Sequence, residues 1–363
     1  MSLVNEINMN IKSEQSATAY TVHALTKDKF QQWDAYVAKH EQASVYHLTA
    51  WKTLIEQTFG HQCDYFYALN AQGECCGILP SVNLNSRLFG NYIVSMPYFN
   101  YGGALADNPQ IIELLNEQLQ QLAQQRQVSH IQYREQAPRS DSALKVSTDK
   151  VNMILALPES ADALGKMIGS KRRSQIKRPI REGVTHQVGG AELLNDFYQV
   201  FCQNMRDLGT PVYSKAFFQA ILNTFAQQCT LVLVYWQGKP VSAGFLIRYR
   251  DRLEIPWAST LNYANRISVN MYLYWQILSH AIETGCTEFD FGRSTIDQGT
   301  YKFKKQWGAE PQQCYWYYWL TEQGELPNLS PSNKKFELAI KIWQKLPLMV
   351  TNRLGPLLVK NLP

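Results

Sequence analysis

The spacing of hydrophobic residues changes its period along the chain, and the changes predict a series of helices and strands. Apolar side chains three and four positions apart indicate helices, whereas short apolar runs beside turn residues indicate strands. The first part of the chain then contains two helices, a three-stranded meander, a third helix and a closing strand. Their ranges are 27–40, 49–59, 63–96, 111–126 and 129–135.

The second part of the chain repeats the end of this plan. Three predicted helices come first, followed by a hairpin, a further strand, a long helix and a closing strand. Their ranges are 161–182, 191–207, 215–227, 229–250, 253–259, 268–285 and 287–292. Because hairpin, strand, helix and strand recur in one order, we predict an α/β (α+β) fold of two tandem domains. Each has a mixed, mainly antiparallel sheet flanked by helices.

Polar segments without periodicity mark the domain boundaries. Residues 138–149 contain Pro and several Ser residues, and they predict a break between a first domain at 21–145 and a second at 150–325. Residues 1–20 are polar and are predicted to be a disordered N-terminus. Residues 330–363 are predicted to form a basic amphipathic helix.

Composition indicates a folded protein without a metal site or a membrane span. Hydrophobic side chains make up 45% of the 363 residues and charged ones 18%, against about 25% charged in an average globular protein. We find neither a secretory signal nor an apolar run near the ~18 residues of a membrane span, so we expect a cytoplasmic protein. The seven cysteines and the histidines lack metal-ligand spacing, which predicts free thiols and no metal.

The net charge of +5 conceals three basic segments. Residues 166–182, 293–305 and 330–363 together carry +14, which leaves −9 on the rest of the chain. Charge of one sign at this density needs an anionic ligand or pairing with the acidic body. The modest total does not point to DNA, whereas clustered Arg side chains suit phosphate groups through their planar, two-pronged donors.

Residues 169–183, which make up most of the first basic segment, are predicted to be a helix that ends or kinks at Pro179. Arg172, Arg173 and Arg178 are our candidate contacts to a phosphate-bearing substrate. The alternative is that these arginines pair with Asp or Glu side chains of the acidic body.

The second basic segment lies at and after the closing strand, where open sheets usually place their chemistry. Asp290 in the strand is either a proton acceptor or a cap or partner of Arg293. If the following segment is extended, Lys302 and Lys304 face one side and Lys305 the other. The alternative for these lysines is a solvated strand end.

Strand 253–259 offers a second carboxyl group. Pro256, which cannot donate a ladder hydrogen bond, suits a bulge in this strand. Glu254 could act as the base for an attacking amine, with its pKa raised by burial against Trp257; the alternative is a paired or exposed carboxylate. At the start of the next helix, side chains and backbone amides could hold a phosphate. The candidate donor-binding residues are Trp257, Arg266, Ser268 and Asn270.

Two aromatic or amphipathic segments near the C-terminus remain open to two interpretations. Alternation over 314–320 predicts a last strand with aromatic rings on both faces, either for sheet packing or as a platform for sugars. The helix predicted within 330–363 could lie on an anionic membrane surface or dock on the two-domain body.

The tandem halves, the basic "KRRSQIKR" of residues 171–178 and the stretch "FDFGRSTIDQGTYKFKKQWG" of residues 289–308 resemble the FemAB family. More closely, they are similar to FemAB-like proteins that accompany bacterial exopolysaccharide and exosortase systems. The resemblance covers about residues 40–325, and 289–308 is its specific part. It implies two domains of the GNAT acyltransferase fold. It also implies transfer of an acyl group, from acyl-CoA as co-substrate, to an amine or hydroxyl of a cell-envelope polysaccharide or peptidoglycan precursor.

The resemblance also implies roles and partners. Phe303 and Lys304 match a Phe-Lys pair of the family's acceptor and transfer cleft, so Lys304 is expected to stabilise phosphate or a developing oxyanion. The full catalytic set is Lys304, Glu254, Asp290 and Tyr301, and the substrate-binding set is Arg172, Arg173, Arg178, Arg293, Lys302, Phe303 and Lys305. The implied partner is a phosphate-bearing glycan or lipid-linked precursor, reached in the cytoplasm or peripherally on the inner face of the membrane.

Two alternatives remain at this point. Aminoacyl-tRNA could be the donor, as in Fem-type peptidyltransferases, although the long coiled-coil arm of several such enzymes is missing. Against acyl-CoA as the donor, the chain has no Gly-rich phosphate-binding loop before the helix predicted at 268–285, where acyl-CoA enzymes of the GNAT type usually have one. A different class is a non-enzymatic protein that binds a phosphate ligand, a nucleic acid or a membrane surface through its basic segments.

Overall fold

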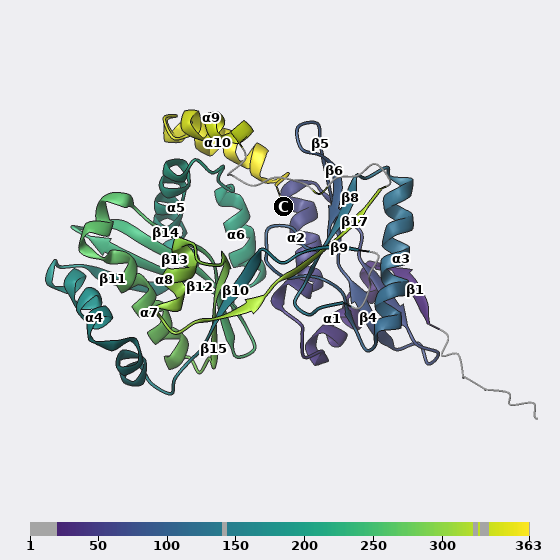
Figure 1. Cartoon of the computed structure of the whole chain (residues 1–363), viewed down its shortest axis with the longest axis horizontal. Coiled ribbons are helices and arrows are strands. Elements are labelled where there is room, and N and C mark those ends of the chain that lie inside the picture. Colours follow the sequence, from purple (N-terminus) through teal and green to yellow (C-terminus); the bar gives the residue numbers. More distant parts are fainter. Residues whose placement is uncertain (1–19, 140–143, 322–325, 327–333, 363) are drawn as a thin grey trace, which may run out of the picture.

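The computed structural model describes residues 20–139, 144–321, 326 and 334–362. The segment predicted to be disordered, 1–20, lies outside the described residues except for Tyr20. Figure 1 shows two sheet-containing domains side by side, with the C-terminal helices along the upper edge.

The first domain contains two sheets. One has the order β1-β3-β4-β7 and the other the order β2-β5-β6-β8-β17-β9. Their strands are β1 (Thr21–Ala24), β2 (Gln62–Cys63), β3 (Phe66–Leu69), β4 (Cys75–Leu79), β5 (Val82–Ser86), β6 (Gly90–Val94), β7 (Leu105–Ala106), β8 (His130–Glu135), β9 (Lys145–Ser147) and β17 (Tyr315–Leu320). Helices α1 (Phe30–Lys39) and α2 (Thr49–Phe59) contribute to the core on one side, and α3 (Pro109–Gln125) to the core on the other.

The second domain is built on one seven-stranded sheet, ordered β11-β12-β13-β14-β15-β10-β16. Its strands are β10 (Lys150–Ala156), β11 (Thr185–Gly189), β12 (Cys229–Trp236), β13 (Lys239–Tyr249), β14 (Arg252–Thr260), β15 (Glu288–Thr295) and β16 (Glu310–Gln313). Helices α4 (Ala161–Arg181) and α7 (Val269–Glu283) pack on one face, and α5 (Leu194–Leu208) and α6 (Lys215–Thr224) on the other. The short α8 (Gly299–Lys305) follows β15.

The two domains share the repeated unit that the hydrophobic pattern predicts. In each, a helix joins two neighbouring parallel strands: α3 joins β6 to β8, and α7 joins β14 to β15. The predicted meander over 63–96 is wrong in detail, because its middle run divides at Pro80 into β4 and β5. These two strands belong to different sheets.

The last strand crosses between the domains. β17 pairs antiparallel with β8, so it lies in the first domain's sheet although the sequence predicted it within 150–325. Beside β8 it takes the position that β10 takes beside β15. Hydrophobic alternation reports which faces of a strand are buried, but not which sheet the strand joins.

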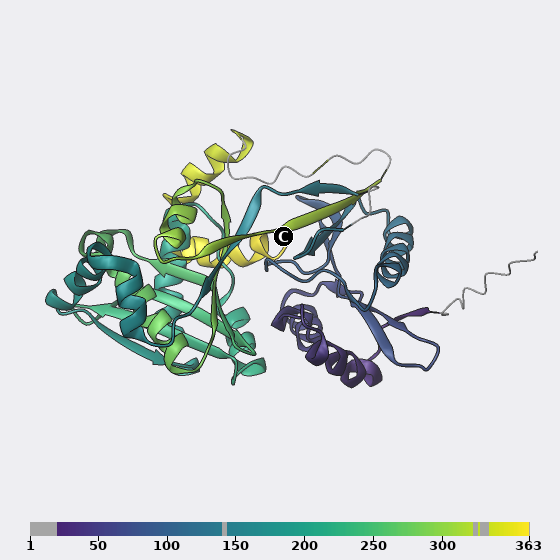
Figure 2. The ribbon, with the colours of Figure 1, turned by 60° about the horizontal axis from the view of Figure 1, so that its bottom comes forward.

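One hydrophobic core runs through both domains. Trp51 of α2 stacks on Phe225 with ring centres 4.8 Å apart, and Phe99 meets Trp257 of β14 at 5.9 Å. These rings belong to a single cluster that includes α1 and α2 together with α5 and α6. The chain therefore buries a set of aromatic residues between the domains, where the ribbons approach in Figure 2.

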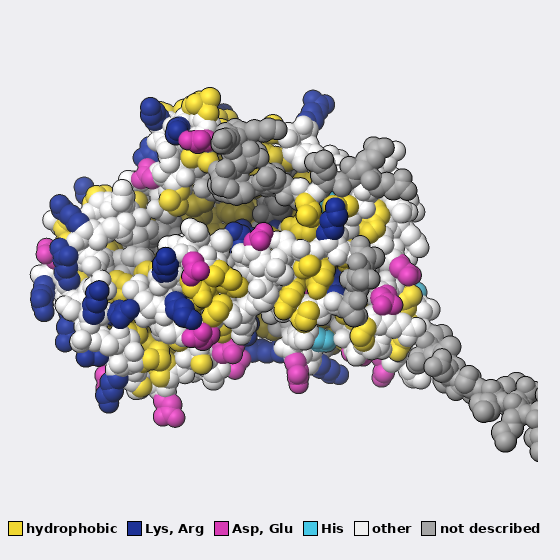
Figure 3. Space-filling view, viewed as in Figure 1, with side chains coloured by type: hydrophobic (Ala, Val, Ile, Leu, Met, Phe, Trp, Pro, Cys, Tyr) yellow, Lys and Arg dark blue, Asp and Glu magenta, His cyan; other side chains and the backbone are white. Residues whose placement is uncertain are grey.

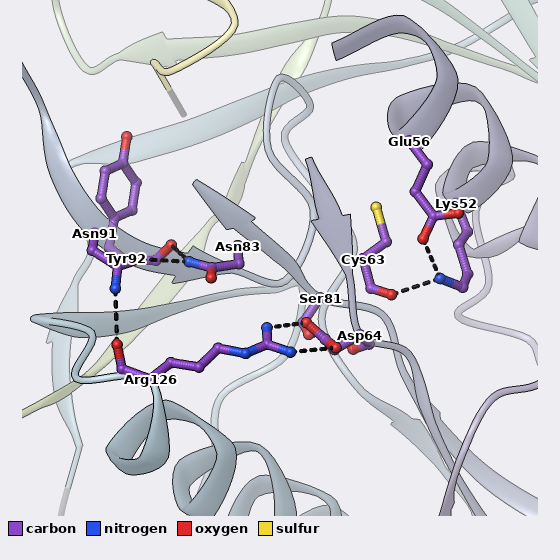
Figure 4. Close-up of polar contacts among 9 residues, drawn as sticks. All are labelled: Lys52, Glu56, Cys63, Asp64, Ser81, Asn83, Asn91, Tyr92 and Arg126. Atoms are coloured by element: carbon purple, nitrogen blue, oxygen red, sulfur yellow. Dashed lines mark hydrogen bonds and ion pairs between the residues drawn. The ribbon is translucent and has the colours of Figure 1, made fainter. Parts of the chain in front are cut away.

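Polar contacts connect the end of α3 with neighbouring segments of the first domain, as Figure 4 shows. Arg126, which follows α3, forms a two-pronged ion pair with Asp64 and accepts a hydrogen bond from Asn91 at 3.0 Å. Asn83 donates to the carbonyl of Tyr92 at 3.0 Å. These contacts tie the end of α3 to Asp64, between β2 and β3, and to β6, and they join β5 to β6.

The C-terminal segment forms two helices in place of the single one predicted for 330–363. They are α9 (Lys334–Trp343) and α10 (Leu348–Val359), with Pro347 between them. α10 packs on α5, and the carbonyl of Lys360 accepts hydrogen bonds from His61 at 2.7 Å and from Tyr98 at 2.6 Å. One face of this segment therefore docks on both domains.

Gly355 allows the close approach of α10. A Cβ atom there would lie 2.8 Å from the nitrogen and 2.9 Å from the carbonyl oxygen of Val212, both backbone atoms. We predict that Gly355→Ala lowers the free energy of unfolding by about 1–3 kcal/mol and exposes α10 to limited proteolysis. Gly165→Ala in α4 is the matched control, because its Cβ meets only ordinary contacts. Unchanged stability and protease resistance in Gly355→Ala would contradict the prediction.

Candidate active site

Two adjacent strands of the second domain part at a pair of carboxyl groups. β14 and β15 run parallel and are paired at Arg252–Glu288, Leu253–Phe289 and Glu254–Asp290, where their ladder ends. β14 then carries an extra residue opposite β13 between Glu254 and Trp257, which is the bulge predicted at Pro256. Because Glu254 and Asp290 are in register, their side chains leave the sheet on the same face.

Glu254 is buried and receives a hydrogen bond from the other domain. The hydroxyl of Tyr46, before α2, donates to its Oε2 at 2.7 Å. Burial raises the pKa of Glu254 to about 7, although the Tyr46 hydrogen bond and Arg252 act in the opposite direction. A carboxyl group with this pKa can exchange a proton near neutral pH.

Asp290 is fully buried beside it. Its Oδ1 accepts a hydrogen bond from the amide of Gly292 at 2.7 Å, while Oδ2 has no partner within the described residues. Burial raises the pKa of Asp290 to about 7, against the lowering influence of Gly292 and Lys304. Asp290 is therefore placed by its own strand, and one oxygen remains available to a ligand.

Lys304 reaches this point from α8. Its Nζ donates to the carbonyl oxygens of Gly292 at 2.9 Å and Arg293 at 2.8 Å. Burial lowers the pKa of Lys304 to about 8, and Asp290 opposes the shift. An ammonium group has three N–H donors, and among the described residues only these two acceptors meet them. Lys304 thus fixes the backbone turn after Asp290 and keeps a positive charge at the split.

Gly292 makes that backbone turn possible. It adopts φ = +73°, and a Cβ there would lie 3.5 Å from Nδ2 of Asn100 in the first domain. The loop that carries Asn100 thus lies over the end of the paired region. Both domains contribute to the site, which no local spacing in the sequence indicates.

Arg293 adds an accessible cation at the same end of β15. Its guanidinium lies 5.0 Å from the ring centre of Trp316, on β17, and the side chain is exposed. Burial by the surrounding protein lowers the pKa of Arg293, although the side chain keeps contact with solvent. Within the described residues Arg293 has no ion-pair partner, so the predicted pairing with Asp290 is not formed.

Arg134 of β8 lies on the same indole ring. Its guanidinium is 4.6 Å from the ring centre of Trp316 and donates to the carbonyls of Met96 and Phe99. Burial, with the nearby charge of Arg293, lowers its pKa to about 9. Arg134 therefore supports the loop of Phe99, and Arg293 is the solvent-exposed cation of this pair.

The segment after β15 is not extended, which was the condition for Lys302 and Lys304 to share one side, because Gly299–Lys305 is the helix α8. Lys304 consequently points into the site, while Lys302 and Lys305 are exposed and do not share its direction. Phe303 packs edge-on against Tyr274 at 5.0 Å, and half-buried Tyr301 packs on the same core. Successive side chains of a helix point in different directions around its axis, so Lys302 and Lys304 do not share one side as they would in a strand.

The basic helix lies away from the carboxyl pair. Arg172, Arg173 and Arg178 are on α4, which packs with α7 on the opposite face of the sheet from Tyr46. α4 kinks at Gly169, where φ is +78°, rather than at Pro179. No ion pair involves its arginines among the described residues, so they do not neutralise the acidic body.

A separate groove follows this kink. Its volume is about 460 Å³, and it lies between the two halves of α4 and Trp275 of α7. The residues that line it include Lys166, Arg173 and Lys177. A ligand that uses these cations would bind there and not directly at Glu254.

Of the four candidate donor-binding residues, three lie together. Arg266, Ser268 and Asn270 lie around the start of α7, at the end of β14. Ser268 makes no side-chain cap, since it adopts φ = +63°, and Arg266 lies 5.1 Å from the ring centre of Trp236. Trp257 instead packs among aromatic rings of α6 such as Phe218, at 5.1 Å. It faces the core and not the start of α7.

The sequence did not identify three residues that complete the site: Tyr46, Arg134 and Trp316. Tyr46 lies 208 positions from Glu254, and β17 brings Trp316 across from the second domain. Among the described residues, no three His, Cys, Asp or Glu side chains are arranged to hold a metal ion. The described helices include none with the length and apolar character that a membrane span needs. All seven cysteines are free thiols.

Comparisons with known proteins bear on the family and the fold of this chain. Residues 170–305 match the family model described as an acetyltransferase (GNAT) domain. The chain is 25% identical over 162 residues to a UDP-N-acetylmuramoylpentapeptide-lysine N(6)-alanyltransferase of Weissella viridescens. That alignment covers 43% of this chain and 48% of the relative, about half its length.

Solved structures of similar fold extend over most of the chain. A structure of FemX has a TM-score of 0.63 at 14% identity, over 84% of this chain and 98% of that one. A tandem GNAT protein from the clavulanic acid biosynthesis pathway has a TM-score of 0.55 at 10% identity, over 85% of this chain and 100% of that one. Identities this low show the fold alone, and they confirm the predicted fold class of two tandem domains.

The raised pKa of Glu254 has a consequence for stability. The carboxyl group of Glu254 holds its proton more tightly in the folded state than in the unfolded state. Its contribution to the free energy of unfolding is therefore complete below the unfolded-state pKa of ~4.3 and is lost as the pH rises through the folded-state pKa of about 7. Because Gln does not ionise, the variant Glu254→Gln does not lose this stability as the pH rises. We predict that the variant gains up to about 3 kcal/mol relative to the wild type between these pH values, measured by urea unfolding across pH. Exposed Glu283→Gln is the control, and a pH-independent difference for Glu254→Gln would contradict the assignment.

Proposed function

Because the chain is a FemAB-like protein with two GNAT domains, we propose that it is an acyltransferase acting on a cell-envelope precursor. The acyl group passes from a thioester or ester donor to an amine or hydroxyl of a polysaccharide or peptidoglycan precursor. The match to a GNAT domain and the alanyltransferase relative support this enzyme class over a non-enzymatic binding protein. A peptidoglycan precursor is supported by the relative, whose name gives a muramoyl pentapeptide as its substrate. An exopolysaccharide precursor is supported by the sequence resemblance.

The observation that carries the proposal is the carboxyl pair at the parting of β14 and β15. Glu254 and Asp290 both have a pKa raised to about 7 by burial, and both lie in register at the last paired position. Two proton-exchanging groups at one split are suited to general base catalysis, whereas burying them without such a role only destabilises the fold.

The chemistry follows from these positions. Glu254 takes the proton as the acceptor's nitrogen or oxygen bonds to the acyl carbon, and Tyr46 stabilises and orients the carboxylate that does so. Lys304, with the strand amides at the split, stabilises the negative charge that develops on the acyl oxygen. The acyl bond to the donor then breaks, and the departing group takes a proton back. Asp290 is the alternative base.

For the donor, acyl-CoA is our first candidate. GNAT domains generally use acyl-CoA, and Arg266 and Asn270 at the start of α7 lie where a helix N-terminus can help to bind phosphate. Aminoacyl-tRNA is the second candidate. It is favoured by the arginines of α4, which have no ion pairs in the described structure and are therefore open to the phosphates of a polynucleotide, although they face away from the carboxyl pair. The relative's alanyl transfer is consistent with an aminoacyl group.

For the acceptor, we propose a phosphate-bearing glycan or lipid-linked precursor. Arg293 is the cation placed to meet its phosphate, since it is exposed, unpaired in the described residues and close to the carboxyl pair. A lipid-linked precursor also implies a protein that works in the cytoplasm at the inner face of the membrane.

Glu254→Gln tests the base. We predict a fall in kcat/KM of about 10²–10⁴-fold with the fold intact, since the amide cannot accept the proton. The assay follows acyl transfer to UDP-linked muramyl pentapeptide and to a polysaccharide precursor, with Glu283→Gln as control. Asp290→Asn identifies the alternative base. If both variants transfer at the wild-type rate, the carboxyl pair is not the catalytic centre.

Ligand binding tests the donor independently of turnover. We predict that the true donor, at 100 times its dissociation constant, raises the free energy of unfolding by about 2.7 kcal/mol. The panel contains CoA, acetyl-CoA, charged tRNA and UDP-sugars in a thermal-shift assay. Arg266→Ala should weaken the response to CoA, whereas Arg172→Ala with Arg178→Ala should weaken the response to tRNA. No response to any of the four would contradict the proposed transfer.

A further inference from the structure

The C-terminal helices carry an unusual share of the exposed apolar side chains. Of the fifteen large hydrophobic side chains that are exposed in the described residues, six lie between positions 338 and 357. They are Leu338, Ile342, Met349, Val350, Leu354 and Leu357. Met349 is 84% exposed, which is costly for an apolar residue in water. A patch of this kind on one segment usually marks an interaction surface.

These residues lie on the face that does not dock on the protein. On α10 the docked residues are Thr351, Gly355 and Val359, spaced four apart. On α9, Ile340 lies against Gly209 of α5's end and is half-buried. One face of these helices packs on the two domains, and a second face presents apolar side chains to solvent.

Basic side chains flank the outward stripe. Lys341 on α9, Lys345 between the two helices and Arg353 on α10 are exposed. Glu337, the acidic residue among positions 337–362, pairs with Lys341 at 2.8 Å. Hydrophobic side chains with Lys and Arg beside them gather over α9 and α10 at the upper edge of Figure 3. The combination is typical of surfaces that bind the plane of an anionic bilayer.

A hairpin from the first domain extends this edge. The turn between β5 and β6 exposes Leu88 and Arg87, and β6 touches the end of α10 where Tyr92 donates to the carbonyl of Asn361 at 2.7 Å. Figure 1 shows this hairpin and the two helices rising along the same edge. The first domain therefore supplies another apolar side chain with a basic neighbour.

We propose that α9, α10 and the β5–β6 turn form one docking surface for an anionic lipid bilayer. Its apolar side chains enter the headgroup boundary, and its Lys and Arg side chains meet lipid phosphates. A second copy of the chain fits less well, because a symmetric pair would oppose like charges. The purpose of the contact, access to a lipid-linked precursor, rests on the proposed function; lipid binding itself does not.

Vesicle co-sedimentation tests the surface with the full chain. Wild-type protein should sediment with vesicles of mixed phosphatidylglycerol and phosphatidylcholine, less with phosphatidylcholine alone, and less as salt increases. Leu354→Glu with Leu357→Glu should bind anionic vesicles on the order of tenfold more weakly. Val188→Glu is the matched control, since Val188 is 42% exposed and Leu354 43%. Acyl transfer to a soluble acceptor should not change in these variants.

Each other outcome decides against the proposal. Equal sedimentation of the paired Glu variant and the control would overturn it. Concentration-dependent dimers that the Glu variant abolishes, without vesicle binding by the wild type, would assign the surface to a second copy instead. Loss of transfer in Glu254→Gln leaves vesicle binding unchanged, so failure of the two proposals can be distinguished.

Discussion

The hydrogen bond from Tyr46 to Glu254 joins the two domains at a buried carboxyl group, and the arrangement of the candidate site depends on it. A carboxylate deprived of water needs a donor or it takes up a proton. Here the donor comes from the first domain, over a distance of 2.7 Å, and partly offsets the effect of burial on the pKa of Glu254. The site therefore exists only when the domains are packed together.

The rest of the structure maintains that packing. Tyr46 is held by stacking on Phe99, with ring centres 4.0 Å apart, and the loop of Phe99 is held by Arg134. β17 leaves the second domain to pair with β8, and this places the Trp316 ring in contact with both Arg134 and Arg293. An aromatic core and a crossing strand thus give the two carboxyl groups a rigid environment. Such preorganisation is what general base catalysis requires of its surroundings.

The sequence predicted what local pattern can encode. The repeated strand-helix-strand unit, the bulge at Pro256 and the alternation of β17 follow from spacing and side-chain type. The sequence left open whether the segment with Lys304 is extended, because alternating Lys and Phe residues fit both a helix and a strand over so short a stretch. Tyr46 and Trp316 could not be predicted, since their roles arise from contacts between distant segments. The basic helix shows the converse: its charge was evident, but the face of the sheet that it covers was not.

The most direct measurement is the pH dependence of kcat/KM for acyl transfer by the wild type and by Tyr46→Phe. The wild-type rate should rise through a pKa of about 7, as Glu254 loses its proton. Removing the Tyr46 hydroxyl takes away a hydrogen-bond donor to the Glu254 carboxylate, so the rise of kcat/KM with pH should move to higher pH by about 1–2 units. A rise that stays in place, or that moves to lower pH, would show that Tyr46 and Glu254 do not form the catalytic contact.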